Sequence, residues 1–293
     1  MTTLSSSGIA PDIQTMNLCF YGAGSMAEAL VRGVLDRGLT EPSRIGMMNR
    51  QNAERMRELS DRYGITGAVG DAAKETMLRE ADIVFLAMKP KDAADAIRGV
   101  RDLLHPGQLV VSLIAGMTIA TLETLLGKPM PIARTMPNTS STIGLGATGL
   151  SFSASATDAQ RRLTDAMFQA VGLTAMVEEP LLEVVTGLSG SGPAYIYYMM
   201  EAMIAAGAKL GLTPEAAREL TVQTVLGAAH MVKATGEDPA ELRRKVTSPN
   251  GSTQAAIEKF DAYRFTEAVE AAVARSAERA VEMGAEIERN AKS

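Results

Sequence analysis

The sequence predicts an α/β fold in which an N-terminal doubly wound parallel sheet is followed by an all-α C-terminal domain. Short apolar runs alternate with helical segments from Met16 to about Glu178, and from Pro180 onward only long helical patterns remain. Continuous apolar runs are typical of parallel strands that helices cover on both faces. The chain has 293 residues, which is long enough for two domains. We expect a flexible tail over residues 1–15 and domains over residues 16–178 and 179–293.

The first βαβ unit is the strongest local signal. An apolar strand at Met16–Tyr21 leads into a glycine turn, a helix follows at about Ser25–Arg37, and a second strand comes at Arg44–Asn49. The turn reads GAGSMA, which fits the pattern GxGxxA. This motif is weak alone, but its position between a strand and a helix favours a Rossmann-like domain that binds a dinucleotide. A glycine turn without a ligand is the alternative.

A physical requirement explains why each of these residues of the turn is small. Gly22 permits the tight turn, Gly24 lets the backbone approach a pyrophosphate, and Ala27 allows the helix to pack closely on the strand. The residues after the second strand then indicate which dinucleotide binds. Asn49 and Arg50 stand where an acidic residue would bind the ribose 2′-hydroxyl of NAD, and a guanidinium suits the 2′-phosphate of NADP. Arg50 as a solvated surface charge is the alternative.

Two further apolar runs, Asp82–Met88 and Leu109–Ile114, are predicted to be buried strands of the same sheet. Ligands of such sheets bind beyond the carboxyl ends of the strands. Small or singly polar residues stand at these ends, which suits the close approach of a flat nicotinamide ring. These residues are Lys89-Pro90, Ala115-Gly116-Met117 and Met136-Pro137-Asn138-Thr139.

The C-terminal domain is predicted to consist of helices. They are expected at Leu181–Leu188, Pro193–Leu210, Pro214–Ala234, Pro239–Val246, Thr253–Phe260 and Arg264–Met283. The helix YIYYMMEAMIAAGAKLG is apolar nearly all round, so it must be covered on every side. A domain of this size offers limited cover, and we therefore expect a homodimer built from the helices.

The segment VTSPNGSTQAAIEKF, Val246–Phe260, places an Asn-Gly turn and two hydroxyls at the start of a helix. The unpaired N–H groups and the positive dipole end of a helix attract anions, so the segment suits a small carboxylate substrate. The alternative is that Ser252 or Thr253 merely caps the helix.

Composition excludes several classes of protein. The net charge of −5 argues against a nucleic-acid surface, and no stretch has the length of a membrane span. His105 and His230 have no ligands at metal-binding spacing, so no metal is expected. Cys19 is predicted to be a buried, inert thiol. The N-terminus lacks a secretory signal, and we expect a cytoplasmic protein.

Several motifs together resemble the pyrroline-5-carboxylate reductase family. They are FYGAGSMAEA, AMKP, VSLIAGM, RTMPNT, LSGSGPAYIYYMMEA, AKLGL and VTSPNGST, in that order, and they span Met16 to about Gly284. The resemblance implies reduction of Δ1-pyrroline-5-carboxylate to L-proline, the last step of proline biosynthesis. NADPH is the expected hydride donor and NADH a possible one. The expected substrate is a cyclic imine carboxylate. The expected partner is a second copy of the chain, and assembly of the homodimer into a larger homo-oligomer is left open.

Carried over residue by residue, the resemblance implies two sets of binding residues. Those expected at the cofactor are Gly22, Gly24, Ser25, Met26, Asn49, Arg50, Lys89, Pro90 and Asn138. Those expected at the substrate are Ser248, Gly251, Ser252 and Thr253, with Thr253 also expected to be catalytic through a hydrogen bond to the ring nitrogen. The chain departs from the family at Asn250, where glycine is common, and at Ser140-Ser141, where many relatives carry proline. Asn tolerates a left-handed backbone, so the turn should survive.

Two other functions are alternatives to a pyrroline-5-carboxylate reductase. A 3-hydroxyacid dehydrogenase needs a lysine a few residues after the glycine pair that begins the long helix. Here Gly190-Ser191-Gly192 is followed by Pro193, and Lys209 comes almost five turns later. A non-enzymatic cofactor sensor is the second alternative, and the intact SPNGST loop argues against it.

Overall fold

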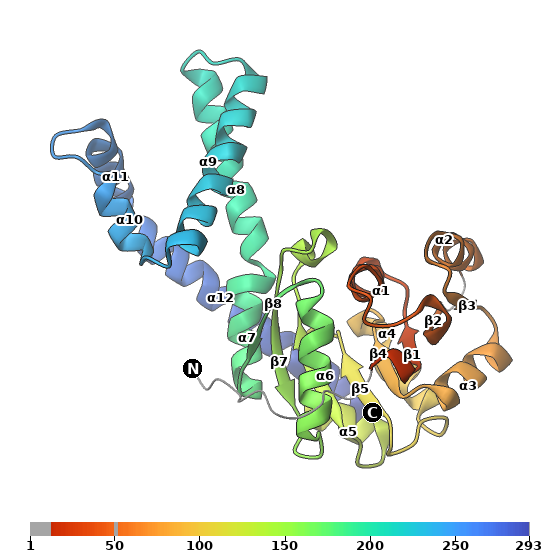
Figure 1. The fold of residues 1–293 in the computed structure, drawn as a ribbon. Coiled ribbons are helices and arrows are strands. Elements are labelled where there is room, and N and C mark those ends of the chain that lie inside the picture. The colour runs from red at the N-terminus through yellow and green to blue at the C-terminus, as the bar shows by residue number, and fades with distance from the viewer. Residues whose placement is uncertain (1–12, 50–51, 293) are drawn as a thin grey trace. The chain divides into compact units, whose positions relative to one another are not determined.

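The computed structural model describes residues 13–49 and 52–292 of the chain and contains two compact units (Figure 1). The first unit contains the described residues up to Ser191 together with those from Arg275 onward, and the second is Gly192–Ala274. The boundary expected at residue 179 stays a prediction. The last helix, α12 (Phe265–Lys292), begins in the second unit and ends in the first.

The first unit is built on one eight-stranded sheet with the order β3-β2-β1-β4-β5-β6-β7-β8. Its strands are β1 (Leu18–Tyr21), β2 (Ile45–Met48), β3 (Thr66–Ala68), β4 (Ile83–Leu86), β5 (Leu109–Ser112), β6 (Ile132–Met136), β7 (Gly146–Phe152) and β8 (Gly172–Met176). Strands β1 to β6 are parallel, β7 pairs antiparallel with β6, and β8 is parallel to β7. The order reverses at β1, so the sheet is doubly wound.

Helices and short helical turns, labelled η, connect these strands. They are η1 (Ile13–Thr15), α1 (Ser25–Asp36), η2 (Pro42–Arg44), α2 (Ala53–Tyr63), α3 (Asp71–Glu80), α4 (Pro90–Val100), α5 (Ile119–Leu126), η3 (Thr139–Ile143), α6 (Asp158–Gln169), η4 (Glu179–Leu181), α7 (Leu182–Val185) and η5 (Thr186–Gly190). Ile13 of η1 is buried in the core, while residues 1–12 of the expected tail lie outside the described residues.

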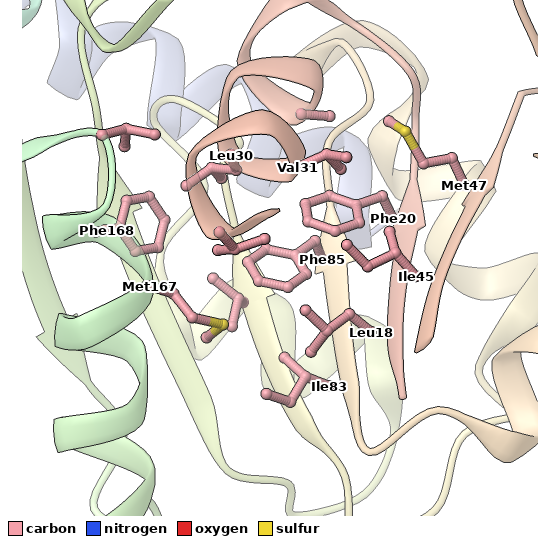
Figure 2. Close-up of a cluster of buried hydrophobic side chains, with 14 of the residues drawn as sticks. Leu18, Phe20, Leu30, Val31, Ile45, Met47, Ile83, Phe85, Met167 and Phe168 are labelled. Carbon is pink, nitrogen blue, oxygen red and sulfur yellow. The ribbon is translucent and has the colours of Figure 1, made fainter. Parts of the chain in front are cut away.

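Alternation along each strand divides the core between the two faces of the sheet. On one face, side chains such as Phe20 and Phe85 pack with residues of α1, α2 and α6, and these two rings are stacked 4.2 Å apart (Figure 2). On the other face, Cys19 and Val84 pack with residues of α3, α4, α5 and the end of α12. Both faces are therefore covered, which explains why these strands read as continuous apolar runs.

The second unit is entirely helical among its described residues. It contains α8 (Gly192–Lys209), α9 (Pro214–Thr235), α10 (Pro239–Lys245), α11 (Ser252–Ala262) and the first turns of α12. Helices α8 and α9 lie side by side as an antiparallel hairpin (Figure 1). The fold class expected from the sequence is confirmed by this architecture.

Three features differ from the predicted elements. The apolar-run pattern does not predict β3, β7 and β8, because small and polar residues dilute their apolar positions. The helix expected at Leu181–Leu188 is instead a short α7 followed by the π-helical turn η5. Helix α12 extends nine residues beyond the predicted end at Met283, to Lys292.

Candidate functional site

The glycine turn after β1 has the geometry of a phosphate cradle. Gly22 has φ of +122°, and a Cβ there would lie 2.4 Å from the carbonyl oxygen of Ala87, so the position requires glycine. Gly24 is the N-cap of α1, and a Cβ there would meet nothing within 4 Å. No side chain caps the first turn of α1, where Ser25 and Met26 lie. The turn thus offers backbone N–H groups and open space to an anion.

A cavity of about 870 Å³ opens beside this turn. Its lining includes Gly22, Gly24, Asn49 and Lys89, so four of the predicted cofactor residues share one cavity. Lys89 is the N-cap of α4, and Pro90 is the first residue of that helix. The predicted 2′-phosphate ligand Arg50 lies outside the described residues. Shape, size and donors fit a dinucleotide.

Lys74 is a cavity residue that the sequence analysis does not identify. It belongs to the first turns of α3, its side chain is 16% exposed, and its ammonium lies 3.8 Å from the carboxylate of the exposed Asp71. A mostly covered cation with such a distant partner suits a phosphate in the same cavity. No motif marks Lys74, because α3 reads as an ordinary amphipathic helix.

Asn138 is buried at the carboxyl end of β6, and its side chain joins two segments. Its amide nitrogen donates to the carbonyl oxygen of Ser189 at 3.0 Å, and its amide oxygen accepts from the backbone nitrogen of Ala147 at 3.2 Å. The amide group has one further N–H that these contacts do not use. Asn138 therefore fixes the segments around this end of the sheet.

The predicted substrate loop forms a tight turn at the start of α11. Asn250 has φ of +58°, which confirms that Asn takes the left-handed backbone expected in place of glycine. The backbone nitrogen of Gly251 donates to the carbonyl oxygen of Ser248 at 3.0 Å, and the backbone nitrogen of Asn250 donates to the side-chain oxygen of Gln254 at 2.8 Å. Gln254, which sequence analysis missed, thus fixes the turn from within the helix.

The N-cap of α11 is Gly251, and no side chain makes the capping hydrogen bond. Ser252 and Thr253 are the first two residues of the helix. The alternative that either hydroxyl caps the helix is therefore wrong. The first turn of α11 is instead an uncapped helix start beside two hydroxyls, which is a suitable place for a carboxylate.

A cluster of charged side chains joins the start of α1 to α2. Glu28 accepts hydrogen bonds from Arg62 and Tyr63, each at 2.8 Å, and from Arg55. Burial raises the pKa of the Glu28 carboxyl, but the hydrogen bonds from Arg55 and Tyr63 and the nearby positive charges outweigh it, so its pKa lies below 4.5. Glu28 is therefore ionised at neutral pH and holds α2 against α1.

Cys19 is a buried free cysteine, as predicted, and burial raises the pKa of its thiol to about 12. No cluster of potential metal ligands occurs within residues 13–49 and 52–292. None of the described helices combines the length and apolarity needed to cross a membrane.

Helices α8 and α9 leave large apolar side chains uncovered. No residue of α8 is buried, and Tyr198 is 77% exposed. Leu220 and Leu226 of α9 are also exposed. A monomer rarely presents such a surface, so these helices fit the expected interface with a second subunit.

Two family profiles match the chain. The profile described as pyrroline-5-carboxylate reductase dimerisation matches residues 179–283. The profile described as NADP oxidoreductase coenzyme F420-dependent matches residues 17–116. The first contains α8, α9 and the substrate loop, and the second contains the glycine turn and the strands around the cavity.

Sequences and solved structures give the same assignment over nearly the whole chain. Pyrroline-5-carboxylate reductase 2 of Bacillus subtilis is 40% identical over 92% of this chain and 98% of its own. The structure of a pyrroline-5-carboxylate reductase from Coxiella burnetii has a TM-score of 0.86 at 38% identity, covering 92% of this chain and 98% of its own. The Plasmodium falciparum pyrroline carboxylate reductase with NADP bound has a TM-score of 0.81 at 26% identity, covering 92% and 99%.

Proposed function

Because the chain belongs to the pyrroline-5-carboxylate reductase family, we propose that it reduces Δ1-pyrroline-5-carboxylate to L-proline with NADPH as the preferred donor. NADH is the alternative donor. The observation that carries the assignment is the uncapped start of α11 at Gly251, within a chain whose glycine turn also fits a dinucleotide. The protein acts as a homodimer in the cytoplasm, and its helical domain over residues 179–293 supplies both the substrate loop and the interface.

The cofactor cavity holds the donor through three groups of residues. The backbone of Gly22, Gly24, Ser25 and Met26 binds the pyrophosphate at the positive end of α1. Asn49 and Lys74, which line the cavity, and Arg50 would bind the adenosine end with its 2′-phosphate. Lys89, which lines the cavity, would lie with Pro90 and Asn138 towards the nicotinamide. When bound, the cofactor supplies the hydride.

The substrate loop holds the carboxylate of the cyclic imine. Ser248, Gly251 and Ser252 present hydroxyl and N–H donors, and the dipole of α11 favours the negative charge. Thr253, half-buried in the first turn, would hydrogen-bond the ring nitrogen as it becomes an amine. A protonated imine is already electrophilic at carbon 5, so the chain needs to supply proximity and orientation rather than a strong acid or base.

The rival dehydrogenase activity has less support. Lys209 is the last residue of α8, at the opposite end of the helix from Gly192. The hydroxyl chemistry of a 3-hydroxyacid dehydrogenase would require a lysine near the start. Neither the glycine turn nor the substrate loop of this chain supplies such a base.

Initial rates of NADPH and NADH oxidation with pyrroline-5-carboxylate test the proposal directly. Arg50→Ala should raise the KM for NADPH much more than the KM for NADH, because only NADPH carries the phosphate that a guanidinium pairs with. Arg57→Ala removes a positive charge from the exposed surface of α2 and is the matched control. Equal effects of Arg50→Ala on both donors, or an unmodified enzyme that favours NADH, would refute the NADPH preference.

A further inference from the structure

The end of α12 touches the loop that follows β5, backbone against backbone. A Cβ on Gly284 would lie 2.6 Å from the carbonyl oxygen of Gly116, and a Cβ on Gly116 would lie 3.2 Å from the nitrogen of Gly284. Gly116 also has φ of +77°, so its conformation alone favours glycine. Gly284 lies within a helix, where glycine is usually unfavourable, so the contact is the reason for glycine there.

Helix α12 is fixed on both sides of this contact. Before it, the hydroxyls of Ser276 and Ser191 are 2.9 Å apart. After it, Ile287 is buried against the sheet-covering helices, and the Arg98 guanidinium donates to the carbonyl oxygens of Asn290 and Ala291 at 3.2 and 2.6 Å. The helix therefore cannot move away from the loop without breaking these contacts.

The loop is also held from the other side. Met117 is fully buried, Thr118 caps α5 by accepting from the backbone nitrogen of Thr121 at 3.1 Å, and the backbone nitrogen of Ile119 donates to Glu179 at 2.6 Å. The contacts on both sides therefore restrict the backbone of this loop. A methyl group on Gly284 must therefore displace Gly116 and its neighbours.

We infer that Gly284 is a positioning residue, which sets the place of the loop 115–117 at the carboxyl end of β5. This end lies between the ends of β4 and β6, from which Lys89 and Asn138 follow. The inference rests on the proposed function, because it assigns this loop to the nicotinamide half of the cofactor.

The test is Gly284→Ala beside Glu278→Ala. Glu278 lies on the exposed surface of α12, so alanine there should leave kcat and the melting temperature nearly unchanged. Gly284→Ala should instead lower kcat about ten-fold. The Kd of adenosine 2′,5′-bisphosphate, measured by calorimetry, should stay the same, because this fragment of NADP lacks the nicotinamide.

Amide hydrogen exchange in two variants gives a second test. Amide hydrogen exchange in residues 115–117 should become faster in Gly284→Ala, and this readout does not depend on turnover or on the proposed reaction. A chain ending at Met283 should show the same faster exchange, because it lacks the contact and both partners of Arg98. Unchanged exchange and kcat in Gly284→Ala, or weaker binding of the bisphosphate, would overturn the inference. An unmodified enzyme without reductase activity would instead overturn the proposed function.

Discussion

Arg134 and Glu183 form a nearly buried ion pair, with the guanidinium Nη2 lying 2.6 Å from the carboxylate Oε1. The same guanidinium lies 3.1 Å from Glu179, whose oxygen also accepts the backbone N–H of Ile119. One side chain on β6 thus connects the start of α5 with η4 and α7. A buried group of charges is stable only while each charge keeps its partners.

Removal of this arginine should therefore destabilise the protein strongly. Arg134→Met should lower the free energy of unfolding by about 3 to 5 kcal/mol, because it leaves two carboxylates without their cation. Urea denaturation followed by circular dichroism measures the change. Arg275→Met is the control, since Arg275 pairs with Glu282 on the exposed surface of α12, and its loss should lower the free energy of unfolding far less than the loss of Arg134. Similar losses in both variants would contradict the assigned role of burial.

Thr253→Ala should lower the rate of hydride transfer with little change in stability. The lost hydrogen bond to a nitrogen that changes charge should cost about 1.5 to 3 kcal/mol, or roughly ten- to a hundred-fold in kcat/KM. The melting temperature should not fall, because Gly251 and not Thr253 occupies the N-cap. Steady-state kinetics and a thermal melt on one preparation check both expectations. Thr253→Ser keeps the hydroxyl and should keep most of the activity. A variant with normal kinetics and a lower melting temperature would return Thr253 to a structural role.

Leu220→Glu should dissociate the homodimer. Leu220 is 59% exposed on α9, and a charge there cannot be buried in an apolar interface without a partner. Light scattering should show a 31.0 kDa monomer for this variant and a dimer for the unmodified chain. Leu173→Glu is the matched control, because Leu173 is similarly exposed on the edge strand β8 and should leave the dimer intact. Dissociation by Leu173→Glu alone would place the interface on the first unit.

The ionised Glu28 should make stability depend on pH. Its pKa in the folded protein lies below the ordinary 4.5, so the unfolded chain binds more protons as the pH falls through this range. Its contribution is therefore complete above pH 4.5 and is lost as the pH falls through the lower folded value. The difference in unfolding free energy between the unmodified protein and Glu28→Gln should be largest near neutral pH and shrink in acid.

A control of equal charge change separates this effect from the general charge of the protein. Glu54→Gln lies at an exposed position in the first turn of α2 and should change the unfolding free energy by at most about 0.5 kcal/mol near neutral pH. Chemical denaturation across an acid series measures both variants. A difference for Glu28→Gln that stays constant from neutral to acid pH would contradict the prediction.

The parts of the fold that sequence could predict are those in which local pattern and burial agree. Strands β1, β2, β4 and β5 are continuous apolar runs because both of their faces are covered, and they were predictable within a few residues. Strands β7 and β8 were not, because Gly146–Phe152 consists mainly of small residues whose pairing is decided by β6. Their place in the sheet depends on contacts that no local pattern contains.

The residues of the candidate site also differ in whether the sequence alone could predict them. Gly22 and Asn250 could be predicted because the positive φ at each, and the close contact of Gly22 with Ala87, limit the residue type. Lys74 and Gln254 could not, since a lysine or glutamine in the first turns of a helix is ordinary until the fold shows what lies opposite. The predicted end of α12 comes too early in the sequence. Gly284 resembles a helix stop, whereas the close contact with Gly116 is what requires a glycine there.

The two glycines of the cofactor turn are subject to different selection. Any side chain at Gly22 would collide with Ala87, so its loss prevents the turn itself from forming. Gly24 has an ordinary φ of −76° and open space around it, so a side chain there should leave the protein folded and obstruct only the proposed dinucleotide. In a lineage that gave up proline synthesis but kept the protein, Gly22 would persist while Gly24 drifted. We therefore expect the residue at position 24 to indicate whether a descendant still binds its dinucleotide.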